Sequence, residues 1–208
     1  MNSYMGPVSY VAHHDVHKPD STTTPLRVVT NTSLKNINAG LSPNDCMQEG
    51  PNALSSLLEV LIGFRMCEVG LVYDMTKAYQ SIQTGEIEKH VRRLVWRWGD
   101  VDGSWDILAY NVVTFGDQIA GLILELVKRL AAELGRSIDP EACHQIREKT
   151  YVDDGAGGGT RDQVERFRGK CVDGVYDGTL PRILSLVNLK LKVMVASGDT
   201  DEESQITR

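Results

Sequence analysis

The sequence lacks the features that mark membrane, secreted and zinc-stabilised proteins. No apolar run approaches the ~20 residues of a membrane-spanning helix, and no charged stretch followed by an apolar one opens the chain, so neither a span nor a signal peptide is expected. The four cysteines are widely scattered and form no CxxC pair, which indicates neither a zinc site nor a disulfide framework. They are typical of reduced thiols, and we expect an intracellular, cytoplasmic protein.

The sequence also lacks an excess of positive charge. Its 208 residues carry 28 acidic against 22 basic side chains, and the net charge is −6. A free nucleic-acid-binding module is usually basic, so composition alone argues against that class. The length suits one domain, or one domain and a lobe, with a core that folds by itself.

Hydrophobic spacing predicts strands and helices in a mixed order. The predicted strands cover residues 26–29, 69–73, 91–98, 107–113, 150–152 and 189–195. The predicted helices cover residues 52–62 with Asn52 as N-cap, 76–82, 122–134 ending at Gly135, 140–149, 160–171 and 180–187. In the helix at 122–134 we expect Leu122, Ile123, Leu126, Val127, Leu130 and Leu134 to form the apolar face. Because the strands are local and helices interrupt them irregularly, we predict an α+β sheet backed by helices rather than a doubly wound parallel sheet.

Two acidic positions follow predicted strands. Asp74 ends a strand with no charge in the four residues before it, and Asp153 and Asp154 follow another short strand. An aspartate at a buried strand end is costly unless it is paired or bound to metal. Two such ends on adjacent strands suit a pair of Mg²⁺ ions, which prefer oxygen ligands and clamp a transferring phosphoryl group when ~4 Å apart.

An ordinary structural role for these acids stays open. An Asp-Asp pair before glycines is usually a turn, and a lone aspartate at a strand end often caps a helix. The glycine-rich residues 155–159 match no GxxxxGK[ST] phosphate loop, and we interpret them as a flexible connection.

Three motifs resemble the catalytic segments of reverse transcriptases. Tyr151-Val-Asp-Asp154 matches their YxDD box. Val72-Tyr-Asp-Met-Thr-Lys-Ala-Tyr79 looks like their first catalytic motif, an aspartate followed five residues later by an aromatic. Tyr110-Asn-Val-Val-Thr-Phe-Gly116 is similar to the segment that holds the template and the incoming nucleotide.

A fourth motif lies near the N-terminus. His13-His14 followed by residues 18–29 resembles the fingers of long-terminal-repeat retrotransposon enzymes, most like the Bel-Pao group. The resemblance covers residues 10 to 195 and implies an RNA-directed DNA polymerase that adds deoxynucleotides to a primer 3′-hydroxyl by two-metal phosphoryl transfer. It also implies a palm-type antiparallel sheet with a partial fingers subdomain.

The resemblance assigns metal-binding roles to four residues. Asp74 and Asp153 would bridge two Mg²⁺ ions, for which Mn²⁺ can substitute, with help from the backbone carbonyl of Met75. Asp154 would be the third catalytic acid. Carboxylate oxygens at these positions suit a pair of Mg²⁺ ions that clamp a transferring phosphoryl group.

The resemblance assigns nucleotide-binding roles to five more residues. Tyr79 would lie under the sugar and exclude a 2′-hydroxyl, although a packed aromatic is the alternative from the sequence alone. Arg27 would grip the triphosphate, which suits its planar guanidinium, with Lys18 as a weaker partner. Phe115 and Gly116 would flank the nascent base pair.

Three further groups are weaker candidates. Lys190 or Lys192 would help pyrophosphate leave, but a solvated strand face is favoured. His13, His14 and His17 have spacing compatible with a metal, which the resemblance makes unnecessary. The basic residues Lys89, His90, Arg92, Arg93 and Arg97 suit either a phosphate backbone or a charged surface.

The resemblance also predicts domains and partners. Residues 1–50 would be partial fingers and 51–198 the palm, with fingers elements interleaved at 84–115 and an acidic tail at 199–208. The expected partners are an RNA or DNA template with its primer and deoxynucleoside triphosphates, with no membrane. Thumb, RNase H and integrase regions of a polyprotein would lie outside these 208 residues.

Three segments depart from the pattern of the family: Asn31, residues 117–121 and residues 155–159. They keep a second interpretation open, a catalytically inactive remnant that retains the fold and at most binds nucleic acid. A third, an unrelated metal-dependent phosphohydrolase that uses the same acids, is disfavoured.

Overall fold

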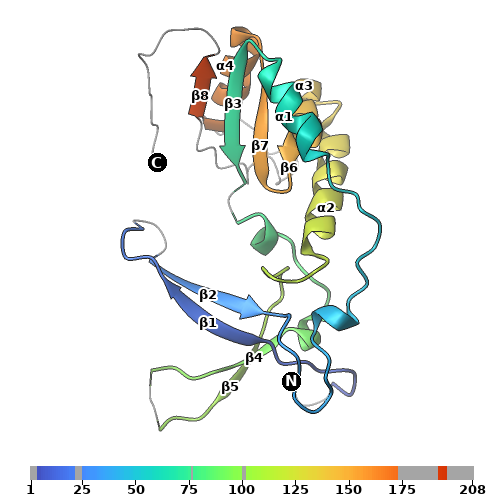
Figure 1. The fold of residues 1–208 in the computed structure, drawn as a ribbon, viewed down its shortest axis with the longest axis vertical. Coiled ribbons are helices and arrows are strands. Elements are labelled where there is room, and N and C mark those ends of the chain that lie inside the picture. The colour runs from blue at the N-terminus through green and yellow to red at the C-terminus, as the bar shows by residue number, and fades with distance from the viewer. Residues whose placement is uncertain (1–3, 22–24, 76, 100–101, 173–191, 196–208) are drawn as a thin grey trace. The chain divides into compact units, whose positions relative to one another are not determined.

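The computed structural model describes residues 4–21, 25–75, 77–99, 102–172 and 192–195. Contacts divide the chain into two compact units. Unit 1 consists of residues 1–50 and 79–120, and unit 2 of residues 51–78 and 121–208. The elements are helices and antiparallel strands, as the α+β class predicts (Figure 1). Within the described residues, no helix has the length and apolar character needed to cross a membrane.

Unit 2 contains a four-stranded antiparallel sheet in the order β6-β7-β3-β8 (Figure 1). Its strands are β3 (Val69–Asp74), β6 (Thr150–Tyr151), β7 (Asp154–Gly159) and β8 (Lys192–Val195). The helices of this part of the chain are α1 (Leu57–Arg65), α2 (Ala120–Gly135), α3 (Pro140–Glu148) and α4 (Arg161–Val172). Helices α1, α3 and α4 all contact β7, so this strand lies at the centre of the unit.

The glycine-rich segment is strand β7, and its interpretation as a flexible connection is wrong. It pairs with β3 from Asp74↔Asp154 to Val69↔Gly159. A Cβ atom on Gly155 would overlap the ring of Tyr73, and one on Gly158 would overlap the backbone oxygen of Val69. Gly158 also has φ +145°, which favours glycine. The glycines are therefore needed because other groups pack directly on the strand backbone.

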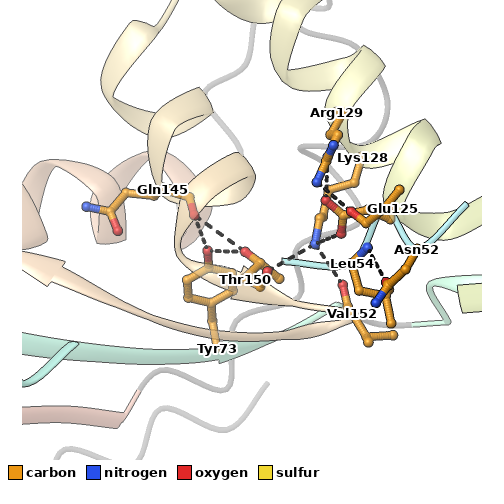
Figure 2. A network of polar contacts seen from close by, with 10 residues as sticks. Asn52, Leu54, Tyr73, Glu125, Lys128, Arg129, Gln145, Thr150 and Val152 are labelled. Atoms are coloured by element: carbon orange, nitrogen blue, oxygen red, sulfur yellow. Dashed lines mark hydrogen bonds and ion pairs between the residues drawn. The ribbon is translucent and has the colours of Figure 1, made fainter. Parts of the chain in front are cut away.

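Tyr73 joins three elements of the core of unit 2 (Figure 2). It is 1% exposed, and its hydroxyl lies 3.0 Å from the carbonyl oxygen of Gln145 and 2.7 Å from Thr150 Oγ1. Its ring also packs against Phe167, with centroids 5.7 Å apart. A buried tyrosine needs a partner for its hydroxyl, and these bonds link β3 to α3 and β6.

The predicted start of the first helix is wrong. Helix α1 begins at Leu57 with Ser56 as N-cap, whose hydroxyl accepts the backbone N–H of Glu59 at 3.4 Å. Asn52 instead accepts the N–H of Leu54 at 3.1 Å. An asparagine side chain that bonds two residues ahead favours a turn over a helix, which explains the later start.

The helix predicted over residues 76–82 is reduced to the 3₁₀ turn η2 (Tyr79–Ser81). Lys77 has φ +52°, which a right-handed helix does not allow. The predicted helix at 180–187, the tail at 199–208 and Lys190 lie outside the described residues.

Unit 1 contains two antiparallel hairpins. Strand β1 (Ala12–His17) pairs with β2 (Leu26–Asn31), and β4 (Arg93–Trp96) pairs with β5 (Asp106–Ala109). The 3₁₀ turns η1 (Asn44–Cys46) and η3 (Glu88–Val91) belong to the same unit. The second hairpin confirms the predicted pair of strands, although both are shorter than predicted.

Candidate active site

Asp153 and Asp154 lie at the hairpin that joins β6 to β7. Tyr151 pairs with Asp154, which leaves Val152 and Asp153 as a two-residue loop. Val152 has φ +55°. Hairpin loops of this length favour glycine or asparagine where φ is positive, and a β-branched residue there is strained. The sequence thus places a strained residue directly before an acid of the candidate site.

The end of β3 meets this hairpin loop. Asp74 lies opposite Asp154 in the β3–β7 pair, and the N–H of Met75 donates to the carbonyl oxygen of Asp153 at 3.0 Å. Three acids from two distant parts of the chain therefore gather at one end of the sheet. Asp74 and Asp153 are partly exposed and Asp154 is exposed.

The charges of this cluster act on one another. Burial raises the pKa of Asp153 above its usual value, and the negative charges of Asp154 and Asp74 raise it further. A backbone hydrogen bond within Asp153 and the cation of Lys128 oppose this shift. The three carboxylates are therefore in mutual repulsion, which a bound divalent cation would relieve.

The chemistry of the donors fits Mg²⁺ or Mn²⁺, because carboxylate oxygens are the ligands that these ions prefer. In the described parts of the chain, no group of three or more His, Cys, Asp or Glu side chains is arranged to hold a metal ion. The acids thus gather without forming a finished three-ligand site. The ligand set that the resemblance implies, Asp74, Asp153 and Asp154 with the carbonyl of Met75, stays a prediction.

The predicted triphosphate ligands lie on the β1–β2 hairpin of unit 1. Arg27 pairs with Val16 in the register, and the N–H of Lys18 donates to the carbonyl of Pro25 at 2.8 Å. Side chains alternate along a strand, so Lys18 and Arg27 belong to the same face of the hairpin. Both side chains are exposed, which leaves two cations near one hairpin tip.

The predicted base-pair and sugar ligands also come together in unit 1. The rings of Tyr79 and Phe115 meet edge to face, with centroids 5.1 Å apart. Thr30 Oγ1 donates to the carbonyl of Phe115 at 2.6 Å, and the hydroxyl of Thr32 donates to that of Gly116. Strand β2 and the residue after it therefore hold the backbone of the Phe115–Gly116 segment.

Gly116 is bound from a second side. Asn44 Nδ2 donates to its carbonyl at 2.9 Å, and Asn44 Oδ1 accepts the N–H of Gln118 at 3.0 Å. With φ +96°, Gly116 has a backbone conformation that a residue with a Cβ rarely adopts. The residues Thr30, Thr32 and Asn44 had no signal in the sequence, because each acts on a segment far along the chain.

Most of the basic side chains at residues 89–97 are buried, so they form neither a phosphate-binding face nor a solvated one. Arg92 and Arg93 are 5% and 8% exposed, and His90 is 7% exposed. Arg92 Nε lies 2.6 Å from Asp117 Oδ2, and Arg93 bonds the ring of His90 at 2.8 Å. These charges are used inside unit 1, since a buried cation needs a partner.

The three histidines do not form a metal site. The ring of His13 stacks on Trp96 with centroids 5.5 Å apart, and His17 Nε2 lies 3.0 Å from Asp15 Oδ2. His14 is exposed on the strand between them. Because side chains alternate along β1, His14 belongs to the other face from His13 and His17.

The predicted apolar face of α2 is wrong in part. Leu126, Leu130 and Leu134 are 52%, 60% and 62% exposed. The buried positions include Glu125 and Lys128 instead. These two residues were missed because a charged pair on a helix normally faces solvent.

Comparison with known proteins adds no assignment. The chain matches no protein-family model. No curated protein is significantly similar to it.

Proposed function

We propose that this chain is the fingers-and-palm part of a reverse-transcriptase-type polymerase of a long-terminal-repeat retrotransposon, similar to the Bel-Pao group. It adds deoxynucleotides to a primer 3′-hydroxyl on an RNA or DNA template. In this proposal the palm is residues 51–198 and includes most of unit 2, while the fingers are residues 1–50 and 84–115 of unit 1.

One observation carries the proposal. The acid at the end of β3 and the acid pair in the β6–β7 hairpin loop gather at one end of an antiparallel sheet, with Met75 N–H bonded to Asp153 O at 3.0 Å. The sequence motifs require the same meeting of Asp74 with Asp153. Burial, together with the charges of Asp154 and Asp74, raises the pKa of Asp153, and such perturbed acids cluster at functional sites.

The residues have separate roles in the proposed reaction. Asp74 and Asp153 would hold the divalent cations, with Asp154 as the third acid and the carbonyl of Met75 as a further oxygen ligand. Divalent cations held there would supply activation of the primer hydroxyl and stabilisation of the charge that develops on the phosphoryl group.

The nucleotide contacts come from unit 1. Arg27 and Lys18 bind the triphosphate oxygens, because two cations on one hairpin face suit a polyanion. The ring of Tyr79 excludes a 2′-hydroxyl, and Phe115 supports that ring edge to face. Gly116 brings its backbone close to the base pair.

The test is primer extension on a primed RNA template with deoxynucleotides and Mg²⁺. We expect incorporation that EDTA abolishes, and a loss of at least about 1,000-fold in Asp74→Asn and Asp153→Asn, because two-metal stabilisation is worth several kcal/mol. Asp162→Asn, an exposed acid in the first turn of α4, is the matched control and should change nothing.

Other outcomes contradict the proposal in different ways. A folded chain that incorporates nothing would identify an inactive remnant. Cleavage of phosphate esters without a template would identify a phosphohydrolase. Full activity in Asp153→Asn would remove the metal role of that acid.

A further inference from the structure

Helix α2 buries an ion pair next to the β6–β7 hairpin. Lys128 Nζ lies 2.7 Å from Glu125 Oε2, and both side chains are 0% exposed. Arg129 Nε lies 2.8 Å from the other oxygen of Glu125 (Figure 2). Removing two charges from water costs free energy that their attraction only partly offsets. A buried ion pair is by itself weak evidence that the pair stabilises the fold. The role of Lys128 is therefore inferred from its other contacts.

The other contacts of Lys128 are to the hairpin backbone. Its Nζ donates to the carbonyl oxygens of Thr150 and Val152, both at 3.2 Å (Figure 2). An ammonium group has three donors, and two of them bond these carbonyls, while the contact with Glu125 is an ion pair. One buried cation therefore binds the backbone on both sides of Tyr151.

Val152 is the residue of the hairpin loop that needs to be held. Its φ of +55° is unfavourable for a β-branched side chain. Such conformations persist where the surrounding structure over-determines them. The bond from Lys128 reaches the carbonyl of Val152 itself, and the next residue is Asp153, whose own carbonyl binds Met75.

We propose that Lys128 is a positioning residue that, oriented by Glu125, holds the strained hairpin loop so that Asp153 stays at the end of β3. The side chain of Lys128 is fully buried and bonds the hairpin backbone, so it acts through the position of Asp153. The positioning itself does not depend on the polymerase activity; its catalytic consequence rests on the proposed function.

The first test measures local opening by amide hydrogen exchange in the whole chain. In Lys128→Met, the amide of Met75, which binds Asp153 O, should exchange at least about 10-fold faster relative to the central amides of β3, because two bonds to a charged group are lost. Arg92→Met is the matched control, since it breaks a buried ion pair of unit 1 and should leave the exchange of Met75 unchanged relative to β3. An unchanged relative exchange rate in Lys128→Met would overturn the proposal.

The variant Val152→Gly serves as a second background in which the backbone strain at residue 152 is absent. Val152→Gly removes the penalty for positive φ, so Lys128→Met should accelerate the exchange of Met75 less in this background than in the natural chain. Equal acceleration in both backgrounds would show that Lys128 supports the unit in general and does not hold the loop. If Lys128→Met does not fold, the double variant Glu125→Gln/Lys128→Met, which leaves neither residue as an unpaired buried charge, takes its place with the same expectations.

The third test is kinetic and separates this proposal from the proposed function. Lys128→Met should lower kcat for nucleotide incorporation about 100-fold with little change in KM, because a small displacement of Asp153 affects the reaction more than binding. A natural chain without activity would contradict the proposed function, while the exchange data still decide the positioning. An active natural chain with unchanged kcat in Lys128→Met would overturn the positioning role alone.

Discussion

The hairpin loop at Val152 in unit 2 and the turn at Gly116 in unit 1 meet the same backbone requirement in different ways. Both residues have positive φ, +55° at Val152 and +96° at Gly116. Glycine adopts this conformation without a Cβ penalty, whereas a β-branched residue is strained there. The comparison indicates that the loop of unit 1 is relaxed, while the loop of unit 2 must be held by its surroundings.

The ion pairs beside the two loops also differ in whether they bond the loop backbone. In unit 1, Arg92 binds Asp117, and Arg92 also donates to the carbonyl of Glu88 at 3.3 Å. In unit 2, Lys128 of the Glu125–Lys128 pair donates directly to carbonyls of the hairpin. The first pair thus stabilises the chain after the turn, and the second constrains the strained loop itself.

The largest effect on stability is expected from breaking the pair of unit 1. Arg92→Met should lower the free energy of unfolding by about 3–5 kcal/mol, because it leaves the buried charge of Asp117 without its partner. Urea denaturation measures this loss. Arg136→Met, which removes an exposed arginine 3.9 Å from Glu133, should change stability by less than about 1 kcal/mol. Similar losses in both variants would mean that Arg92 is not a structural cation.

Substitutions at the two positive-φ positions should change the free energy of unfolding in opposite directions. Gly116→Ala should cost about 1–2 kcal/mol, since its Cβ would also lie 3.1 Å from Thr32 Oγ1 and 3.2 Å from Thr30 O. Val152→Gly should be neutral or stabilising by up to about 1 kcal/mol, because relief of strain outweighs the greater chain entropy of glycine. Thermal or urea unfolding of both variants measures the two changes in stability. A loss of stability in Val152→Gly would remove the contrast between the two loops.

If the proposed polymerase function holds, a smaller effect is expected on the selection between deoxynucleotides and ribonucleotides. Tyr79→Ala should reduce the preference for deoxynucleotides over ribonucleotides by about 10-fold or more, because the ring that contacts Phe115 is removed. Tyr79→Phe keeps the ring and should keep the preference. The measurement is the ratio of kcat/KM for the two sugars on one primed template. An unchanged ratio in Tyr79→Ala would make this aromatic pair a packing contact only.

The smallest expected effect is on the pH dependence of stability in unit 2. The pKa of Asp153 is raised in the folded chain by burial and by Asp154 and Asp74. The folded state therefore binds this proton more tightly than the unfolded state, so stability falls as pH rises through the interval between the unfolded and folded pKa values. Asp153→Asn should increase stability above that interval and have no such effect below the unfolded pKa.

Chemical denaturation at pH 3 and pH 7 in EDTA measures this difference. Excess Mg²⁺ at pH 7 should stabilise the natural chain and not Asp153→Asn, because the proposed cation site needs the carboxylate of Asp153. An Asp153→Asn variant that gains stability equally at both pH values would show that repulsion among the acids is not the cause.

Much of the secondary structure follows from local signals. The apolar run before Asp74 and the periodic helix that ends at Gly135 are both found in the structure. The start of α1 was missed because Asn52 and Ser56 are both good caps, and only the bonds that each makes distinguish them. Strand β7 was missed because glycine has low strand propensity, and its need for glycine comes from Tyr73 and other groups packed on it.

The sequence by itself determined where the acids stand relative to their strands, because strand ends and hairpin loops depend on neighbouring residues. Tertiary structure alone decided that Asp74 meets Asp154 across β3 and β7. It also decided that Glu125 and Lys128 turn inward while leucines of the same helix are exposed. The first outcome depends on the pairing of strands that are far apart in the sequence. The second depends on the backbone carbonyls of Thr150 and Val152, which need a buried donor that Lys128 supplies.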